Sequence, residues 1–206
     1  GAKPVVDRAE SLIFEIAQQE DTSDAQPLNV LLEQEYKRLE AMQGVGVSGI
    51  PTGYHDLDEL TTGFQKGDLI IIAARPSMGK TAISLNLAEQ IARGGLTPDK
   101  PMGKPCPVAY FSLEMSKSAI AQRLLSASSG FSSHQLRSGQ LRVEDYDHLC
   151  KVMYELSEAP IYVDDTPSMT VLQLRTRARR LVSQFGVQCI MIDYLQLMTA
   201  PQVARE

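Results

Sequence analysis

The sequence lacks several features that would place the protein in a special class. It contains no tryptophan, and aromatic residues make up only 6% of its 206 residues. No run of about 18 apolar residues could span a membrane, and the amino terminus has no signal-peptide pattern. We therefore expect no membrane contact. The net charge of −5 argues against a generally basic nucleic-acid-binding surface and leaves room only for a local basic channel.

Cysteine is scarce and scattered. Cys106, Cys150 and Cys189 lack metal-ligand spacing, and an odd, dispersed set is typical of reduced thiols in a cytoplasmic protein. The remaining composition, 43% hydrophobic and 22% charged, is that of an ordinary globular protein. The length suffices for one large domain with a sizeable core and a small appendage.

One stretch, residues 69–81 (LIIIAARPSMGKT), is far more informative than the rest. The apolar run 69–74 predicts a buried strand, residues 75–78 break it, and Gly79-Lys80-Thr81 opens a helical pattern. This order is that of a phosphate-binding loop, in which backbone N–H groups and the helix dipole favour an anion. We expect Lys80 to reach the terminal phosphates and the Thr81 hydroxyl to bind Mg²⁺. The alternative is a chance Gly-Lys-Thr in a core helix, which the order of elements disfavours.

The match to the usual G-x-x-x-x-G-K-[ST] pattern fails at one position. Ala74 occupies the place of the first glycine. Alanine is the smallest substitute, so the loop can still form if this residue keeps a negative φ.

The first part of the chain, residues 1–26, is predicted to be separate from the domain over 27–206. An amphipathic helix over 4–18 is followed by a polar linker over 20–26. The helix either packs on its own domain or docks on a neighbouring subunit, and the residues leave both open. Its apolar stripe consists of Ala9, Leu12, Ile13, Ile16 and Ala17.

Beyond residue 26, apolar strands alternate with helices. Continuous apolar strands of this kind predict a parallel sheet covered by helices on both faces, an α/β fold. Right-handed crossovers then bring the carboxyl ends of the strands to one edge, where ligands bind. Strands are predicted over 69–74, 108–113, 161–163 and 187–192; helices over 27–43, 81–93, 117–129, 143–157 and 170–184; one helical turn near Leu57 and Leu60; and an irregular or short helical segment over 131–141.

Acidic residues follow three of the predicted strands, at Glu114, Asp165 and Asp193, so they can converge with the phosphate loop. Asp193 suits the second magnesium contact of a nucleoside triphosphatase; the alternative is a solvated carboxylate at a strand end. Glu114 suits a base that activates water. It could instead cap the next helix, but Ser116 is the better cap.

Other charged residues carry weaker signals. The spacing of Arg123 assigns it no role. Basic residues gather in one predicted helix, where a solvated face is favoured over contact with a phosphate backbone or an acidic partner. His55, His134 and His148 are far apart in the sequence, and we assign them no catalytic or metal-binding role. The basic residues are Arg175, Arg177, Arg179 and Arg180.

Three segments together resemble a known family. ARPSMGKT, FSLEMS and MIDYLQLM, with the stretch 49–81 (GIPTGYHDLDELTTGFQKGDLIIIAARPSMGKT), are similar to the C-terminal ATPase domain of the bacterial replicative DNA helicase family DnaB. The resemblance spans nearly the whole chain. It implies a RecA-like P-loop fold, a ring-shaped homo-hexamer with ATP and Mg²⁺ between subunits, and a linker helix docked on the adjacent motor domain. Implied partners are single-stranded DNA, primase and a helicase loader, in the bacterial cytoplasm and nucleoid.

The resemblance also implies roles for individual residues. Lys80 and Glu114 would be catalytic, Thr81 and Asp193 would hold the metal, and Arg123 would contact the nucleotide region. The nucleotide phosphates would be held by Ser77, Gly79, Lys80, Thr81 and Ala82.

Family members continue well past the position of Asp193, with DNA-contacting loops and an arginine that reaches a neighbour's nucleotide. We therefore expect a partial motor domain that alone hydrolyses ATP poorly and does not unwind DNA. Two alternatives remain: another RecA-like ATPase of recombination or repair, which the linker helix and the SLEM and DYLQLM segments disfavour, and a non-catalytic docking module for a loader or primase.

Overall fold

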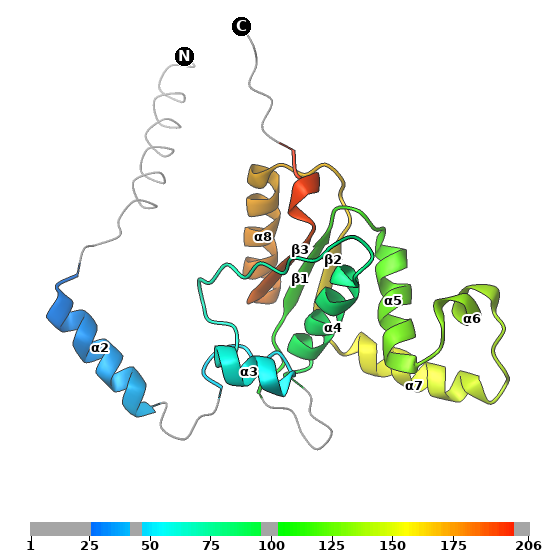
Figure 1. The fold of residues 1–206 in the computed structure, drawn as a ribbon, viewed down its shortest axis with the longest axis horizontal. Coiled ribbons are helices and arrows are strands. Elements are labelled where there is room, and N and C mark those ends of the chain that lie inside the picture. The colour runs from blue at the N-terminus through cyan, green and yellow to red at the C-terminus, as the bar shows by residue number, and fades with distance from the viewer. Residues whose placement is uncertain (1–25, 42–46, 96–102, 200–206) are drawn as a thin grey trace, which may run out of the picture. The chain divides into compact units, whose positions relative to one another are not determined.

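The computed structural model describes residues 26–41, 47–95 and 103–199 (Figure 1). The chain divides into two compact units, residues 1–45 and 46–206, and each is described by itself. In the first unit, the helix predicted over 27–43 is present as α2 (Leu28–Ala41). The amphipathic helix predicted over 4–18 lies outside the described residues, as does nearly all of the polar linker. The division near residue 26 therefore stays a prediction.

The second unit is built on a three-stranded parallel sheet. β1 (Val108–Ser112) lies between β2 (Ile161–Asp164) and β3 (Cys189–Asp193). These strands confirm the predictions over 108–113, 161–163 and 187–192. All five residues of β1 are buried, which is why this segment reads as a continuous apolar run instead of an alternating one.

Helices surround the sheet, and they confirm the predicted alternation. The segment over 131–141 contains a short helix, which begins with a capping box at Ser132. No helix in the described ranges is long and apolar enough to cross a membrane. The helices are α3 (His55–Thr61), α4 (Lys80–Ala92), α5 (Lys117–Ser129), α6 (Ser133–Ser138), α7 (Asp145–Ser157) and α8 (Val171–Phe185), and an unpredicted 3₁₀ turn, η1, covers Leu195–Leu197.

The core has two layers, one on each face of β1, because successive side chains of a strand point to opposite faces. Val108 and Tyr110 belong to a cluster with apolar residues of α4 and α5. Ala109 and Phe111 belong to a second cluster that includes Ala178 of α8. Figure 1 shows α8 on the other side of the sheet from α4 and α5. The expectation of helices on both faces is thus confirmed.

The prediction of a strand over residues 69–74 is wrong. These residues have no regular secondary structure, and the side chains of Leu69 and Ile71 are 82% and 70% exposed. A strand requires a hydrogen-bonded neighbour, and within the described residues this segment pairs with none of β1, β2 and β3. Apolar content identified a segment that favours burial, but it did not supply the neighbouring strand that burial in a sheet requires.

Candidate nucleotide-binding site

The phosphate loop forms even though the strand before it does not. Met78 N–H donates to the carbonyl of Arg75 at 3.3 Å. Ser77 and Gly79 adopt positive φ values of 65° and 85°. Gly79 is the N-cap of α4, and no side chain caps it. The amide groups of the first turn of a 13-residue helix are therefore presented toward the loop, together with the positive end of the helix dipole. This arrangement favours an anion.

Asp193 lies beside the start of α4. Its side chain is only 6% exposed. Oδ2 accepts a hydrogen bond from Thr81 Oγ1 at 2.6 Å, and Oδ1 lies 3.6 Å from Lys80 Nζ. The structure therefore brings together three residues predicted to act at one site, from positions that are more than a hundred residues apart.

Tyr110 of β1 contacts Asp193 and Ser84 from within the core, and the sequence did not identify it as part of the site. Its buried hydroxyl lies 2.7 Å from Ser84 Oγ and 3.4 Å from Asp193 Oδ2. Ser84 in turn donates to the carbonyl of Thr81 at 3.0 Å. Burial raises the pKa of Tyr110 well above its usual value, so the hydroxyl stays a donor. A tyrosine within an otherwise apolar buried strand is the sequence signal that could have indicated this role.

Lys80 has a second contact besides Asp193. Its ammonium lies 3.8 Å from the centroid of the Tyr194 ring, a cation–π arrangement. The side chain is 31% exposed, so the charge is held at the mouth of the loop and not in the core. Carboxylate and ring both stabilise the cation at this place.

Glu114 lies at the same edge of the sheet. Ser112 is in register with Asp193, and Leu113 N–H donates to the carbonyl of Asp193 at 2.8 Å. The exposed Glu114 follows in the turn between β1 and α5. Adjacent strands lie about 4.8 Å apart, so the turn and Asp193 are close neighbours. Ser116 caps α5 by accepting from Ala119 N–H at 3.3 Å, as predicted, so Glu114 is not the cap.

Arg123 contributes to a pocket of about 470 Å³ formed by residues of α4, α5 and α6 and the turn before α5. Ala82, directly after Thr81, lines the same pocket, as does Arg137 of α6. Sequence spacing assigned Arg123 no role, whereas the family resemblance placed it in the nucleotide region. Arg123 thus lines the same pocket as residues of α4, the helix that begins at the phosphate loop.

The donor set at Asp193 and Thr81 suits Mg²⁺. Carboxylate and hydroxyl oxygens are hard ligands, and Mg²⁺ keeps several waters and binds substrate phosphates instead of a full protein cage. In the described part of the chain there is no group of three or more His, Cys, Asp or Glu residues placed to hold a metal ion. A magnesium ion here would therefore be shared with a phosphate ligand.

The remaining predicted residues lie elsewhere. Asp165 follows β2 and contacts Lys117, at the start of α5 and three residues after Glu114. Arg177 is not simply solvated, because it donates to Asp164 at 2.7 Å. Among the histidines, His148 lies 3.2 Å from the carbonyl of Ser129 and packs edge-on against Phe131.

A Gly-Lys-Thr loop that opens a helix next to a parallel sheet, in contact with the acid at the end of β3, is typical of a RecA-like P-loop fold. Two solved structures agree. One is an ATPase domain that superposes with a TM-score of 0.76 at 26% identity, covering 89% of this chain and 62% of that chain. The other is a DnaB-like replicative helicase, whose structural report also describes interactions with primase. It superposes with a TM-score of 0.72 at 26% identity, covering 98% of this chain and 46% of that chain.

The sequence profile of the DnaB-like helicase C terminal domain matches residues 49–206, and the chain belongs to this family. It is 45% identical to the replicative DNA helicase DnaB of Nostoc sp. over 94% of this chain and 21% of that protein. It is 41% identical to the replicative DNA helicase DnaC of Bacillus subtilis over 94% of this chain and 41% of that protein. The chain therefore spans less than half the length of these relatives. The match favours the helicase family over the recombination and repair ATPases.

Proposed function

We propose that the chain is part of the ATP-hydrolysing motor domain of a bacterial replicative DNA helicase. The observation that carries the proposal is the 2.6 Å hydrogen bond between Thr81 and Asp193, at the sheet edge that also bears the Glu114 turn. It joins the phosphate loop to the strand-end acid that a Mg²⁺-dependent phosphoryl transfer requires. The relatives named above are replicative DNA helicases, which supports the same activity.

In this proposal the loop and the start of α4 bind the phosphates of ATP. Backbone N–H groups at Ser77, Gly79 and Ala82 would contact phosphate oxygens, and Lys80 would neutralise charge that builds up on the γ-phosphate. Thr81 and Asp193 would hold Mg²⁺, which supplies charge neutralisation when bound. Arg123 and its pocket would accommodate another part of the nucleotide.

Glu114 would act as the general base. It would accept a proton from the water that attacks the γ-phosphorus, while the bond from that phosphorus to the β–γ bridging oxygen breaks. Its exposed position in the turn after β1 leaves it accessible to water. Lys80 and Glu114 are thus the proposed catalytic residues.

We further propose that the whole protein works as a homo-hexamer on single-stranded DNA in the bacterial cytoplasm. A primase and a helicase loader are proposed partners, and the solved helicase described together with primase supports the first of them. With a net charge of −5, the chain would contact DNA through local basic segments, which predicts a salt-sensitive interaction.

The test is ATP hydrolysis by the full-length protein that contains this chain, with and without single-stranded DNA. Lys80→Ala is expected to abolish nucleotide binding. Glu114→Gln is expected to bind nucleotide normally and to lose about 10²–10⁴-fold in turnover, the usual contribution of a general base. Glu158→Gln, at the end of α7, is the matched control and should behave as wild type. Glu114→Gln turnover within twofold of wild type would contradict the proposal. A wild-type protein that binds primase but hydrolyses no ATP would favour the docking role instead.

A further inference from the structure

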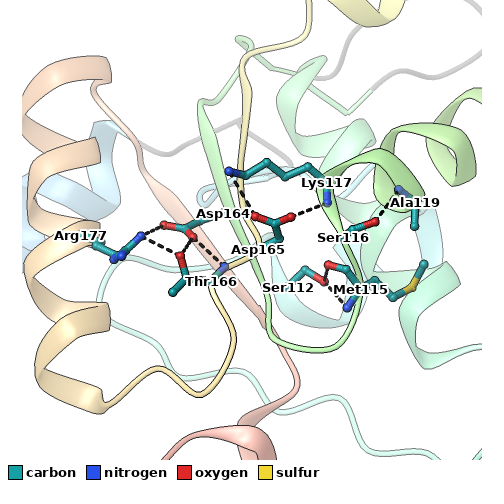
Figure 2. Close-up of polar contacts among 9 residues, drawn as sticks. All are labelled: Ser112, Met115, Ser116, Lys117, Ala119, Asp164, Asp165, Thr166 and Arg177. Atoms are coloured by element: carbon teal, nitrogen blue, oxygen red, sulfur yellow. Dashed lines mark hydrogen bonds and ion pairs between the residues drawn. The ribbon is translucent and has the colours of Figure 1, made fainter.

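Two consecutive carboxylates at the end of β2 reach in different directions (Figure 2). Asp164, the last residue of β2, contacts Thr166 in the loop before α8 and Arg177 of α8. Asp165, the next residue, contacts Lys117, the first residue of α5. One strand end therefore holds two helices that lie on different faces of the sheet.

Both oxygens of the Asp165 carboxylate contact Lys117. Oδ2 accepts from the backbone N–H of Lys117 at 3.0 Å, and Oδ1 lies 3.2 Å from Lys117 Nζ. α5 has no acidic residue in its own first turn. Asp165 thus supplies, from another strand, the negative charge that stabilises a helix N-terminus. These contacts from the Lys117 backbone and ammonium lower the pKa of Asp165.

Lys117 is the far end of the turn that carries Glu114. The near end is fixed at Ser112, whose hydroxyl accepts from Met115 N–H at 3.0 Å and donates to the Met115 carbonyl at 2.8 Å. Ser116, as N-cap, begins α5. Figure 2 shows these contacts and the Asp165–Lys117 pair bracketing the turn. Glu114 is exposed between the two anchors, so its backbone position depends on both.

We propose that Asp165 is a positioning residue for Glu114. By holding the first residue of α5, it fixes the end of the turn from which Glu114 projects toward the attacking water. The inference rests on the proposed role of Glu114 as general base. A general base must lie within hydrogen-bond reach of the proton that it accepts, and a shift of about 1 Å can cost about a hundredfold in rate.

Asp164 provides a matched control on the same strand end. Its Oδ1 accepts from Thr166 Oγ1 at 2.7 Å, and its Oδ2 accepts from Arg177 at 2.7 Å. It is thus at least as well paired as Asp165, but these two partners belong to α8 and to the loop before α8. If any broken ion pair at this place impaired the protein, Asp164 variants would be impaired as well.

The experiment compares Asp165→Ala, Asp165→Glu, Lys117→Met and Asp164→Ala in the full-length protein. The measurements are kcat and KM for ATP hydrolysis and the Kd of a fluorescent ADP analogue. Asp165→Ala is expected to lower kcat by about 10- to 100-fold, with KM and Kd changed less than about twofold. Asp165→Glu, which retains the carboxylate, should recover part of kcat. Lys117→Met keeps the backbone hydrogen bond, so it should lose less than Asp165→Ala. Asp164→Ala should keep kcat near wild type.

Several results would overturn the inference. One is a kcat of Asp165→Ala equal to that of Asp164→Ala; another is a parallel loss of kcat and nucleotide affinity, which indicates general damage. In the Glu114→Gln background, Asp165→Ala should cause no further loss, because residues acting as a unit are not additive; a further loss would show a route that bypasses Glu114. If Glu114→Gln loses turnover while Asp165→Ala does not, only the positioning role fails. If Glu114→Gln keeps its turnover, the proposed role of Glu114 fails, and the inference with it.

Discussion

Thr81 Oγ1 donates a 2.6 Å hydrogen bond to Asp193 Oδ2 and so joins the first turn of α4 to the last residue of β3. The bond is short because its acceptor is a carboxylate, and bonds of this kind are about twice as strong as neutral ones. It fixes the relative position of the two oxygen atoms that are proposed to hold Mg²⁺.

Replacing the Thr81 hydroxyl is expected to weaken the magnesium-dependent part of nucleotide binding. Thr81→Val should raise the Kd of an ADP analogue in the presence of Mg²⁺ by about 10-fold or more, because a hydrogen bond to a charged group contributes about 1.5–3 kcal/mol. Thr81→Ser keeps the hydroxyl and should lose less. Titrations in Mg²⁺ and in EDTA measure the difference; equal affinities for the Val and Ser variants in Mg²⁺ would argue against metal contact at Thr81.

Tyr110→Phe is expected to destabilise the fold by about 0.5–1.5 kcal/mol, the usual net contribution of one hydrogen bond. The hydroxyl that is removed is fully buried and contacts Ser84 at 2.7 Å. Tyr146→Phe, at an exposed position of α7, is the control and should change the free energy of unfolding by less than about 0.5 kcal/mol. Urea denaturation of both variants checks the prediction, which fails if the two losses are the same.

The three cysteines are expected to react with thiol reagents at very different rates. Burial raises the pKa of Cys106 to about 11, and burial raises the pKa of Cys189 to about 12. Cys150 is exposed. Since the thiolate is the reacting form, a disulfide reagent at pH 8 should label Cys150 rapidly and the other two only on unfolding. Cys150→Ser should abolish the rapid phase; fast labelling that persists in this variant would contradict the slow reaction expected of the buried Cys106 and the partly buried Cys189.

The same thiols should make the fold sensitive to alkali. Their usual pKa is 9.0, below the values in the folded protein. Above pH 9 the unfolded chain releases protons that the folded chain retains, so the unfolded state binds fewer protons and stability falls as pH rises. Thermal unfolding between pH 8 and pH 11 should follow this trend, and Cys106→Ala should reduce its slope.

Asp164 is expected to give the opposite pH dependence. Burial acts to raise its pKa, but hydrogen bonds from Thr166 and Arg177 outweigh burial and lower the pKa below 3.8. Its contribution to stability is therefore present above the unfolded pKa and lost as pH falls below about 3.8. Asp164→Asn should unfold less steeply with acid than wild type, in thermal melts from pH 6 to pH 3. An unchanged slope would show that this carboxylate does not carry the acid sensitivity.

Much of the fold could be predicted because its central strand is buried on both faces. Such a strand must be mostly apolar on both faces, and residues Val108–Phe111 of VAYFS satisfy this, with only Ser112 at the strand end polar. The same rule failed at residues 69–74, where the apolar run pairs with none of the strands in the described part of the chain. Hydrophobicity reports which segments favour burial, whereas pairing depends on residues elsewhere in the chain.

The site was predictable to the extent that strand ends meet at one edge. Asp193 and the Glu114 turn meet as expected, since β1 and β3 are neighbours in register. The contacts that hold these residues were not predictable, because each partner is remote in sequence. Tyr110 reaches Asp193 from the adjacent strand, and Asp165 reaches Lys117 from 48 residues away.

The position of β1 also sets a time scale for folding during synthesis. Its first residue, Val108, is in register with Ile161 of β2 and with Cys189 of β3. At roughly 5–20 residues per second, the roughly 80 residues between β1 and its last partner take about 4–16 s to synthesise. Throughout that interval the strand that is fully buried in the folded protein has no complete sheet to enter. Protection of this segment from aggregation must therefore come from the helices made meanwhile or from a chaperone.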